Sequence, residues 1–168
     1  MVINFKIKKM ELENSKNVDV KIYAHKVTPN AVIPEVVYNS TSACFDITCT
    51  KTTIIPSKGS AVVPNGLNLT IDQKDNYWMQ IQLRSSKGFK HELIPHYGTV
   101  DAGYTGDLGV KIYNIGFEEI LIEEGERYAQ IAVIPKPNYE IIELNDTQWG
   151  DFKTQQERGD KGFGSSGK

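Results

Sequence analysis

The chain has 168 residues, of which 39% are hydrophobic and 24% charged, and this size and composition indicate one globular domain with a sizeable core. Nineteen Lys and Arg residues stand against 21 Asp and Glu residues, for a formal net charge of −2. This balance argues against a broad surface for nucleic acid or acidic lipid, but it leaves room for a small basic cluster that binds a phosphorylated small molecule.

The cysteines and histidines also restrict the class of protein. Cys44 and Cys49 are five residues apart and would face opposite sides of a strand, so we expect no disulfide between them. The three histidines lack zinc-ligand spacing. Free thiols are typical of a reducing compartment, and residues 1–10 resemble neither a signal peptide nor a membrane span. We therefore expect a cytoplasmic protein (in the host's cytoplasm if its source is a phage or virus) that does not bind membranes.

The first half of the chain contains alternating apolar and polar residues. This pattern predicts half-buried strands at 2–8, at 18–24 and at 45–49. Two prolines make residues 28–34 an extended or turning segment.

Prolines and glycines then cut the chain into short strands near 53–55, 60–63 and 67–71. Residues 77–83 form the clearest predicted strand, because large apolar residues occupy alternate positions. A short helix is expected at 87–93.

Residues 97–114 contain four glycines between two apolar runs, which predicts a β-hairpin whose turn needs positive φ or close backbone approach. Asp101 and Tyr104 lie inside the predicted turn. The unpaired main-chain amides of this turn and the Tyr104 ring could bind a flat polar ligand, which would leave the Asp101 carboxylate free to take part in a reaction. The alternative is a glycine-rich surface hairpin without a site.

The last third of the chain continues the β pattern. Five glutamates in 118–126 favour a solvated edge over a metal site, and further strands are expected at 128–134 and 139–144. Residues 145–157 are expected to be a polar connection and 158–168 a mobile tail. Frequent turn signals without long helical periodicity predict an all-β barrel or sandwich with no internal domain boundary.

Several polar segments could contact phosphate. In the tail, glycines, serines and basic residues surround Phe163; glycine lets amides converge on an anion, and the ring could stack on a base. Arg84-Ser85-Ser86 could bind phosphate or simply end a strand, and Gln130 could add a contact or be a surface residue. Asp46 could reach a metal-bound water or pair with backbone amides.

Five segments, in order, resemble the five motifs of the homotrimeric dUTPases (dUTP diphosphatases, or deoxyuridine 5′-triphosphate nucleotidohydrolases). These segments are Ala43–Ile47, Arg84–Ser86, Gly98–Gly106, Gly125–Gln130 and Arg158–Gly167. The resemblance covers roughly residues 25–167.

The resemblance implies a distorted jelly-roll or β-clip barrel of short antiparallel strands with at most one short helix. Residues 1–157 would form this single domain, and 158–168 would be a flexible arm that closes over the active site. It also implies a homotrimer, in which one subunit supplies the predicted hairpin, a second the phosphate-binding motifs and a third the tail.

The chemistry implied by the resemblance is hydrolysis of dUTP to dUMP and diphosphate, which keeps uracil out of DNA and supplies dUMP for dTMP synthesis. Asp101 would activate the water that attacks the α-phosphorus. Mg²⁺ would bridge the triphosphate oxygens, and Asp46 would reach the ion through water.

The resemblance also implies roles for residues around the substrate. Gly98 and Val100 belong to the segment that would bind uracil through main-chain groups, and Tyr104 would pack under the deoxyribose and exclude a 2′-hydroxyl. The residues expected to hold the phosphate chain or close over the substrate are Arg84, Ser85, Ser86, Gln130, Arg158, Phe163, Gly164, Ser165 and Ser166, with Phe163 stacked on uracil.

Four sites depart from the family's usual residues: Cys44, Lys87, the Ala102-Gly103 pair and Lys161. Lys87 could add a phosphate contact or simply be exposed. A dCTP deaminase-like enzyme and a nucleotide-sensing or protein-binding regulator are alternatives on the same scaffold. The Asp101-to-Tyr104 spacing and the tail around Phe163 favour the diphosphatase.

Overall fold

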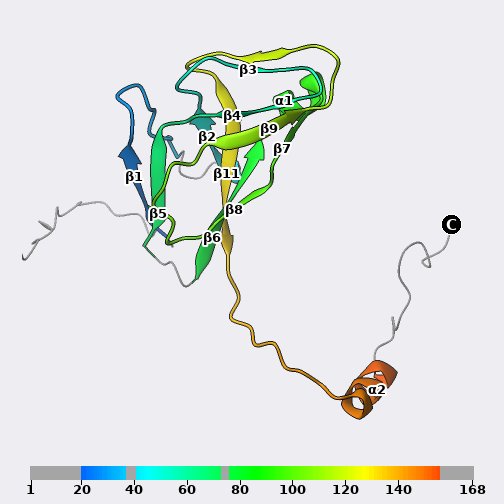
Figure 1. Cartoon of the computed structure of the whole chain (residues 1–168). Helices are drawn as coiled ribbons and strands as arrows, with labels where there is room; N and C mark the ends of the chain where they lie inside the picture. Colours follow the sequence, from blue (N-terminus) through cyan, green and yellow to red (C-terminus); the bar gives the residue numbers. More distant parts are fainter. Residues whose placement is uncertain (1–19, 37–40, 73–75, 156–168) are drawn as a thin grey trace, which may run out of the picture. The chain divides into compact units, whose positions relative to one another are not determined.

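The computed structural model describes residues 20–36, 41–72 and 76–155 (Figure 1). The chain divides into two compact units, residues 1–136 and 137–168, which are described separately. Among the described residues, no helix is long and apolar enough to span a membrane.

Short strands are the main secondary structure in the described part of the first unit, as predicted for an all-β protein. They are β1 (Ile22–Lys26), β2 (Cys44–Thr48), β3 (Thr53–Ile55), β4 (Ser60–Val63), β5 (Leu67–Ile71), β6 (Tyr77–Leu83), β7 (Leu93–Pro95), β8 (Gly98–Val100), β9 (Val110–Asn114), β10 (Ile120–Ile122) and β11 (Arg127–Pro135). The strands predicted at 53–55, 60–63, 67–71 and 77–83 are confirmed with those bounds. The prolines and glycines between them end each strand where the sequence indicated.

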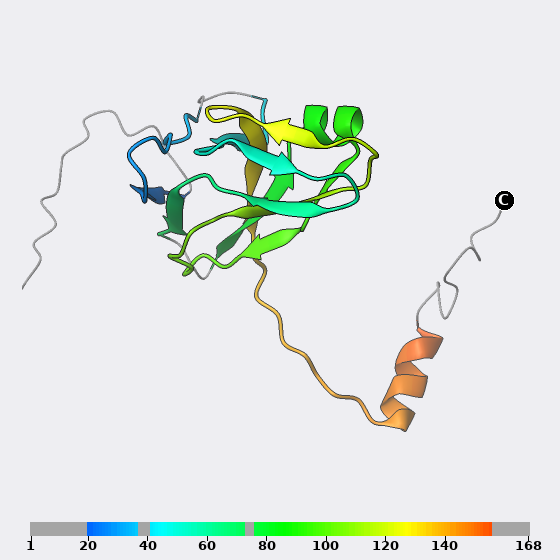
Figure 2. The same ribbon diagram turned by 45° about the horizontal axis from the view of Figure 1, so that its top comes forward.

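The strands pair antiparallel in four small sheets (Figures 1 and 2). The largest has the order β2-β11-β6-β8, and a second has the order β4-β9-β7. β1 pairs with β5, and β3 pairs with β10. Neighbours in each sheet are mostly distant in sequence, so the sheets are held together by long-range contacts.

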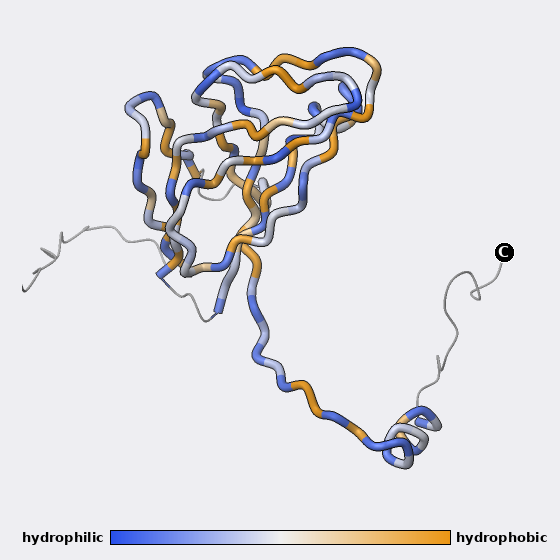
Figure 3. The backbone as a smooth tube through the Cα atoms, viewed as in Figure 1, coloured by the Kyte–Doolittle hydropathy of each residue, from blue (hydrophilic) through white to orange (hydrophobic). Residues whose placement is uncertain are grey.

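A single hydrophobic core lies inside these sheets. Hydrophobic and hydrophilic positions alternate along several strands (Figure 3), and in β6 the side chains of Met79, Ile81 and Leu83 are buried. Tyr128 of β11 is fully buried and its hydroxyl donates a 2.9 Å hydrogen bond to the Val63 carbonyl. Burial raises the pKa of this hydroxyl, so Tyr128 remains a neutral donor.

Two elements of this unit are displaced from their predicted positions. The helix expected at 87–93 is α1 (Ser85–His91), which begins and ends two residues earlier. The residue after it, Glu92, has a left-handed backbone conformation with φ 51°. The strand expected at 18–24 is found at 22–26, and Ala24 of its predicted inner face is exposed. The strand predicted at 2–8 lies outside the described residues.

The prediction of a β-hairpin within 97–114 is wrong. β8 pairs with β6, whereas β9 pairs with β4 and β7, so the two strands belong to different sheets. The connecting residues, 101–109, are too many for a tight turn, and main-chain bonds attach them to β5. The glycines therefore belong to a loop that crosses between two sheets.

Both cysteines are free, as expected. The Cys49 thiol is buried and donates to the Lys51 carbonyl at 3.0 Å. Burial raises the pKa of Cys49, which keeps this thiol neutral. The half-buried Cys44 sulfur accepts a hydrogen bond from the Gln82 amide at 3.2 Å.

The described part of the second unit, residues 137–155, contains α2 (Asp146–Thr154) and no strand. Asn145 and Gln148 form a reciprocal capping box at its start, with bonds of 2.9 and 3.0 Å. Trp149 stacks on Phe152 with ring centroids 6.0 Å apart.

Two predictions for this unit are wrong. The strand expected at 139–144 is absent, and its apolar side chains Tyr139, Ile141 and Ile142 are exposed. The polar connection expected at 145–157 contains α2, which makes two short helices instead of at most one. The capping box is a local helix-start signal that the polar composition concealed.

Candidate active site

The loop at residues 101–109 is attached to the core at both ends. Near its start, the Ala102 carbonyl accepts hydrogen bonds from the Thr70 hydroxyl at 2.7 Å and from the Ile71 amide at 3.3 Å. At its end, the buried Asn65 amide donates to the Leu108 carbonyl at 2.7 Å. These bonds fix the backbone that carries Asp101 and Tyr104.

Asp101 and Tyr104 are joined by a turn within this loop. The Tyr104 amide donates to the Asp101 carbonyl at 2.9 Å, and the Tyr104 hydroxyl donates to the Asp107 carbonyl at 3.1 Å. The Asp101 side chain is exposed and the Tyr104 ring is 46% exposed. A carboxylate and an aromatic face are thus presented to solvent on a fixed backbone.

Glycine at position 106 is required by the Tyr104 ring. A Cβ at this position would lie 2.6 Å from Cζ of Tyr104, closer than two carbon atoms approach without bonding. A Cβ at Gly103 in the same loop would meet nothing within 4 Å. Gly106 therefore determines where the Tyr104 ring lies.

β8, the strand before this loop, exposes main-chain groups to a ligand instead of side chains. β8 is the edge strand of its sheet, and Gly98 has no side chain while that of Val100 is 8% exposed and packs in the core. An edge strand carries amides and carbonyls with no strand partner on one side. This edge can form backbone hydrogen bonds with a flat polar ligand.

A second polar cluster lies on β2, β11 and β6. Asp46, Gln130 and Gln82 are directly opposite one another in the register of these three strands. The Asp46 carboxylate pairs with Nε of Arg84 at 3.2 Å and with Nη1 of Arg127 at 3.3 Å. Arg84 also donates to the Arg127 carbonyl at 3.3 Å. Among the described residues, Asp46 therefore pairs with arginine side chains instead of the backbone amides considered from the sequence.

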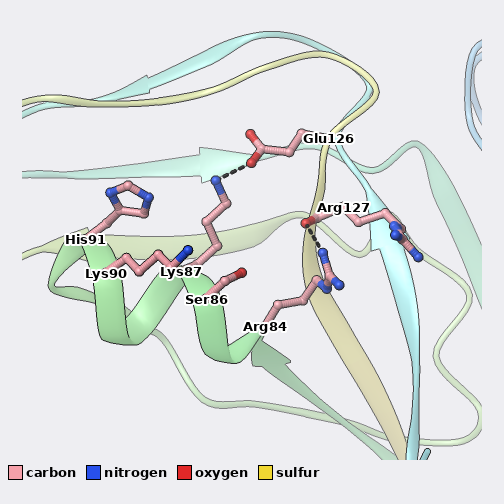
Figure 4. Close-up of a pocket in the computed structure, with 7 residues that line it drawn as sticks. All are labelled: Arg84, Ser86, Lys87, Lys90, His91, Glu126 and Arg127. Carbon is pink, nitrogen blue, oxygen red and sulfur yellow. Dashed lines mark hydrogen bonds and ion pairs between the residues drawn. The ribbon is translucent and has the colours of Figure 1, made fainter.

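A pocket of about 270 Å³ lies beside this cluster, between α1 and the start of β11 (Figure 4). It is lined by Arg84, Ser86, Lys87, Lys90, His91, Glu126 and Arg127. Lys90, His91, Glu126 and Arg127 were not predicted as site residues. Spacing could have indicated Lys90, because residues four apart share a face of a helix and Lys90 follows Ser86 by four.

Lys87 is not the exposed residue considered from the sequence, and because it lines the pocket its contact with phosphate stays a prediction. It is buried, 8% exposed, and its ammonium forms an ion pair with Glu126. The other four glutamates of 118–126 are exposed, in agreement with a solvated edge.

Within one chain, the two groups of predicted site residues lie on either side of β6, the first on β8 and the loop after it, the second on β2, β11 and the end of β6. Val100, next to Asp101, pairs with Met79, and Arg84 follows Met79 by five residues. At about 3.4 Å per residue, this places Asp101 and Arg84 about 17 Å apart along the strand, while Gly98 and Gln130 lie opposite the neighbouring β6 residues Ile81 and Gln82. One group contains Gly98, Val100, Asp101 and Tyr104; the other contains Asp46, Arg84, Ser85, Ser86 and Gln130. Arg158, Phe163, Gly164, Ser165 and Ser166 lie outside the described residues.

Comparison with known proteins gives consistent matches. The family model described as dUTPase matches residues 30–167. The deoxyuridine 5′-triphosphate nucleotidohydrolase of Wolinella succinogenes is 38% identical over 152 residues, 89% of this chain and 95% of the relative. The enzyme of that name from Leptospira interrogans serovar copenhageni is 35% identical over 152 residues, 88% of this chain and 99% of the relative.

A solved structure agrees with these relatives. The dUTPase of Staphylococcus bacteriophage 80alpha, a G164S mutant solved with dUpNHpp, is 26% identical with a TM-score of 0.76, and the match covers 88% of this chain and 99% of that chain.

Proposed function

This chain belongs to the dUTPase family and hydrolyses dUTP, and we propose that it does so at active sites shared between the subunits of a homotrimer. The observation that carries this proposal is the separation of Asp101 and Arg84 along β6. A base that activates water must lie within hydrogen-bond reach, about 3 Å, of the reacting groups. Asp101 and Arg84 of one chain, about 17 Å apart along β6, favour a site in which each comes from a different subunit.

Asp101 would act as the general base. Its exposed carboxylate lies on a loop held by β5, so little reorganisation is needed to place a water in line with the α-phosphorus.

The edge of β8 and the Tyr104 ring would select the base and the sugar. Main-chain groups at Gly98 and Val100 can distinguish uracil from cytosine, because the donor and acceptor pattern of cytosine is reversed at ring positions 3 and 4. Tyr104, held by its bond to the Asp107 carbonyl, would pack under deoxyribose and leave no space for a 2′-hydroxyl.

The second cluster would hold the phosphate chain. Arg84, Ser86 and Arg127 line one pocket, with Gln130 nearby on β11. Hydroxyl, amide and guanidinium donors are suited to phosphate oxygens. Arg158 and the tail around Phe163 would close over the substrate from a further subunit.

Mg²⁺ is part of the proposal because the residues present fit a largely hydrated ion. Among the described residues, no group of three or more His, Cys, Asp or Glu side chains could hold a metal by itself. Mg²⁺ usually keeps several waters and binds through phosphates and one or two carboxylates. Asp46, 24% exposed and paired with two arginines, would contact such an ion through water. When bound, Mg²⁺ would offset the charge of the triphosphate.

The proposed setting is the cytoplasm, where removal of dUTP keeps uracil out of DNA and the product dUMP feeds dTMP synthesis. We propose no nucleic-acid or membrane partner.

The test is diphosphate release from dUTP, dTTP, dCTP and UTP by the purified protein with Mg²⁺. We expect release from dUTP alone, and elution of the protein as a trimer in light scattering. Ammonia release from dCTP would instead assign the chain to the deaminases of the same scaffold. Full activity in a monomer would contradict the shared site.

Gly106→Ala is expected to weaken selection against ribonucleotides. The added Cβ displaces the Tyr104 ring, which is half exposed and can move, so we expect a stability loss of no more than about 1 kcal/mol. The ratio of kcat/KM for dUTP to that for UTP should fall by about tenfold.

Gly103→Ala is the matched control for this variant, since its Cβ meets open space in the same loop. It should retain the selectivity of the unchanged protein. Equal losses in both variants would show that loop flexibility, rather than the position of the Tyr104 ring, sets the selectivity.

A further inference from the structure

Lys87 is the only charged residue among the buried residues that the structure describes. Its side chain is 10% exposed, and its ammonium contacts one carboxylate oxygen of Glu126. A buried charge is tolerated when it is paired, and breaking such a pair leaves the remaining charge uncompensated. This ion pair therefore joins α1 to the segment before β11 (Figure 4).

Glu126 is itself held in place by the turn at 123–126. Its second carboxylate oxygen accepts a hydrogen bond from the Glu123 amide at 3.1 Å. Its main-chain carbonyl accepts from the Cys49 amide at 2.8 Å, and Gly125, with φ 83°, donates to the Cys49 carbonyl at 2.8 Å. The partner of Lys87 is thus fixed to the end of β2 before any ligand binds.

On the other side of the pair, Lys87 directly follows Arg84-Ser85-Ser86. Its amide donates to the Arg84 carbonyl at 2.9 Å, and the Arg84 amide donates to the Tyr128 carbonyl at 3.2 Å. Together, the ion pair and these main-chain bonds link α1 to the start of β11. They position Ser86 and Arg127, which both line the pocket.

We propose that Lys87 and Glu126 are positioning residues for the triphosphate. The pair fixes Ser86 and Arg84 of one segment against Arg127 and Gln130 of the other, so that the donors to the phosphate chain are in place before the substrate binds. In this role Lys87 acts through Glu126 and not by its own contact with phosphate. This inference rests on the proposed function of the pocket as the phosphate-binding part of the dUTP site.

The test compares Lys87→Met, Glu126→Gln and the double variant. Each single change leaves one charge without its partner, and the double change removes both, so the double variant should regain much of the thermal stability lost in Lys87→Met and Glu126→Gln. Glu126→Gln keeps an oxygen that can accept from the Glu123 amide. The readout is affinity, by calorimetry, for non-hydrolysable α,β-imido-dUTP and for deoxyuridine, which has no phosphate.

In the double variant, we expect Kd for α,β-imido-dUTP to rise about tenfold or more, as loss of a positioning partner commonly does. Kd for deoxyuridine should not change, because its contacts lie on β8 and the 101–109 loop. Lys111→Met, which removes an exposed lysine of β9, controls for the loss of positive charge in Lys87→Met and should leave both affinities unchanged.

Two results would overturn the proposal. One is a double variant, folded as judged by its melting temperature, with unchanged affinity for α,β-imido-dUTP. The other is an equal loss of affinity for deoxyuridine, which indicates general damage. If the double variant does not fold, the same two affinities of Glu126→Gln decide the outcome. A wild-type protein that does not bind α,β-imido-dUTP would refute the function itself, which is a distinguishable failure.

Discussion

Asp101→Asn is expected to lower kcat for dUTP by about 10²–10⁴-fold, the usual contribution of a general base. The amide cannot accept the proton of the attacking water, but it has nearly the shape of the carboxylate. The Asp101 main chain, which accepts from the Tyr104 amide, is unchanged. KM should therefore change little, and steady-state diphosphate release measures both constants.

Asp107→Asn is the matched control for this variant. Asp107 is an exposed carboxylate in the same loop, and it holds Tyr104 through its main-chain carbonyl, not its side chain. Its replacement should leave kcat within about twofold, since a surface change of this kind has small effects. A comparable loss in both variants would mean that the charge of the loop, and not a base at Asp101, supports the reaction.

The largest loss of stability is expected from Asn114→Leu. Asn114 is 2% exposed at the end of β9 and makes three hydrogen bonds with its side chain. It donates to the carbonyls of Ile55 at 3.1 Å and Glu118 at 2.7 Å, and it accepts from the Gly116 amide at 2.9 Å. A leucine side chain cannot form these hydrogen bonds, so the Ile55 and Glu118 carbonyls and the Gly116 amide lose their side-chain partner.

We expect this variant to lose about 3 kcal/mol of unfolding free energy, because each buried polar group left unpaired costs about 1–3 kcal/mol. The melting temperature should fall by about 10 °C, measured by calorimetry at equal subunit concentration, since assembly stabilises by mass action.

Asn68→Leu makes the same replacement on β5 and is the control. The Asn68 side-chain oxygen is buried and has no hydrogen-bond partner among the described residues. Leucine there should cost less than about 1 kcal/mol. Equal losses at positions 114 and 68 would show that leucine itself, and not the lost hydrogen bonds, destabilises the sheets.

Much of the fold could be predicted because its signals are local. Proline and glycine bound β3, β4 and β5, and strict alternation marks β6, so these strands were predicted with the bounds that the structure has. α2 was not predicted, because the largely polar composition of its segment is typical of a connection. The Asn145–Gln148 capping box is nevertheless a local signal for the start of a helix.

The order of motifs also made the family and the reaction recognisable before the structure, since motif order and spacing need no three-dimensional information. The family match over residues 30–167 agrees with that reading. The tail residues that complete the fifth motif lie outside the described residues, so their roles remain predictions.

The sequence alone therefore indicated the class of fold and the reaction, together with the residues expected to perform it. The tertiary structure decided which of these residues are neighbours. Strand pairing joins residues far apart in the chain, so only the register of β6 shows Asp101 and Arg84 at opposite ends of one strand, and only packing shows Lys87 buried against Glu126. Both results depend on long-range contacts, which local periodicity and propensity do not encode.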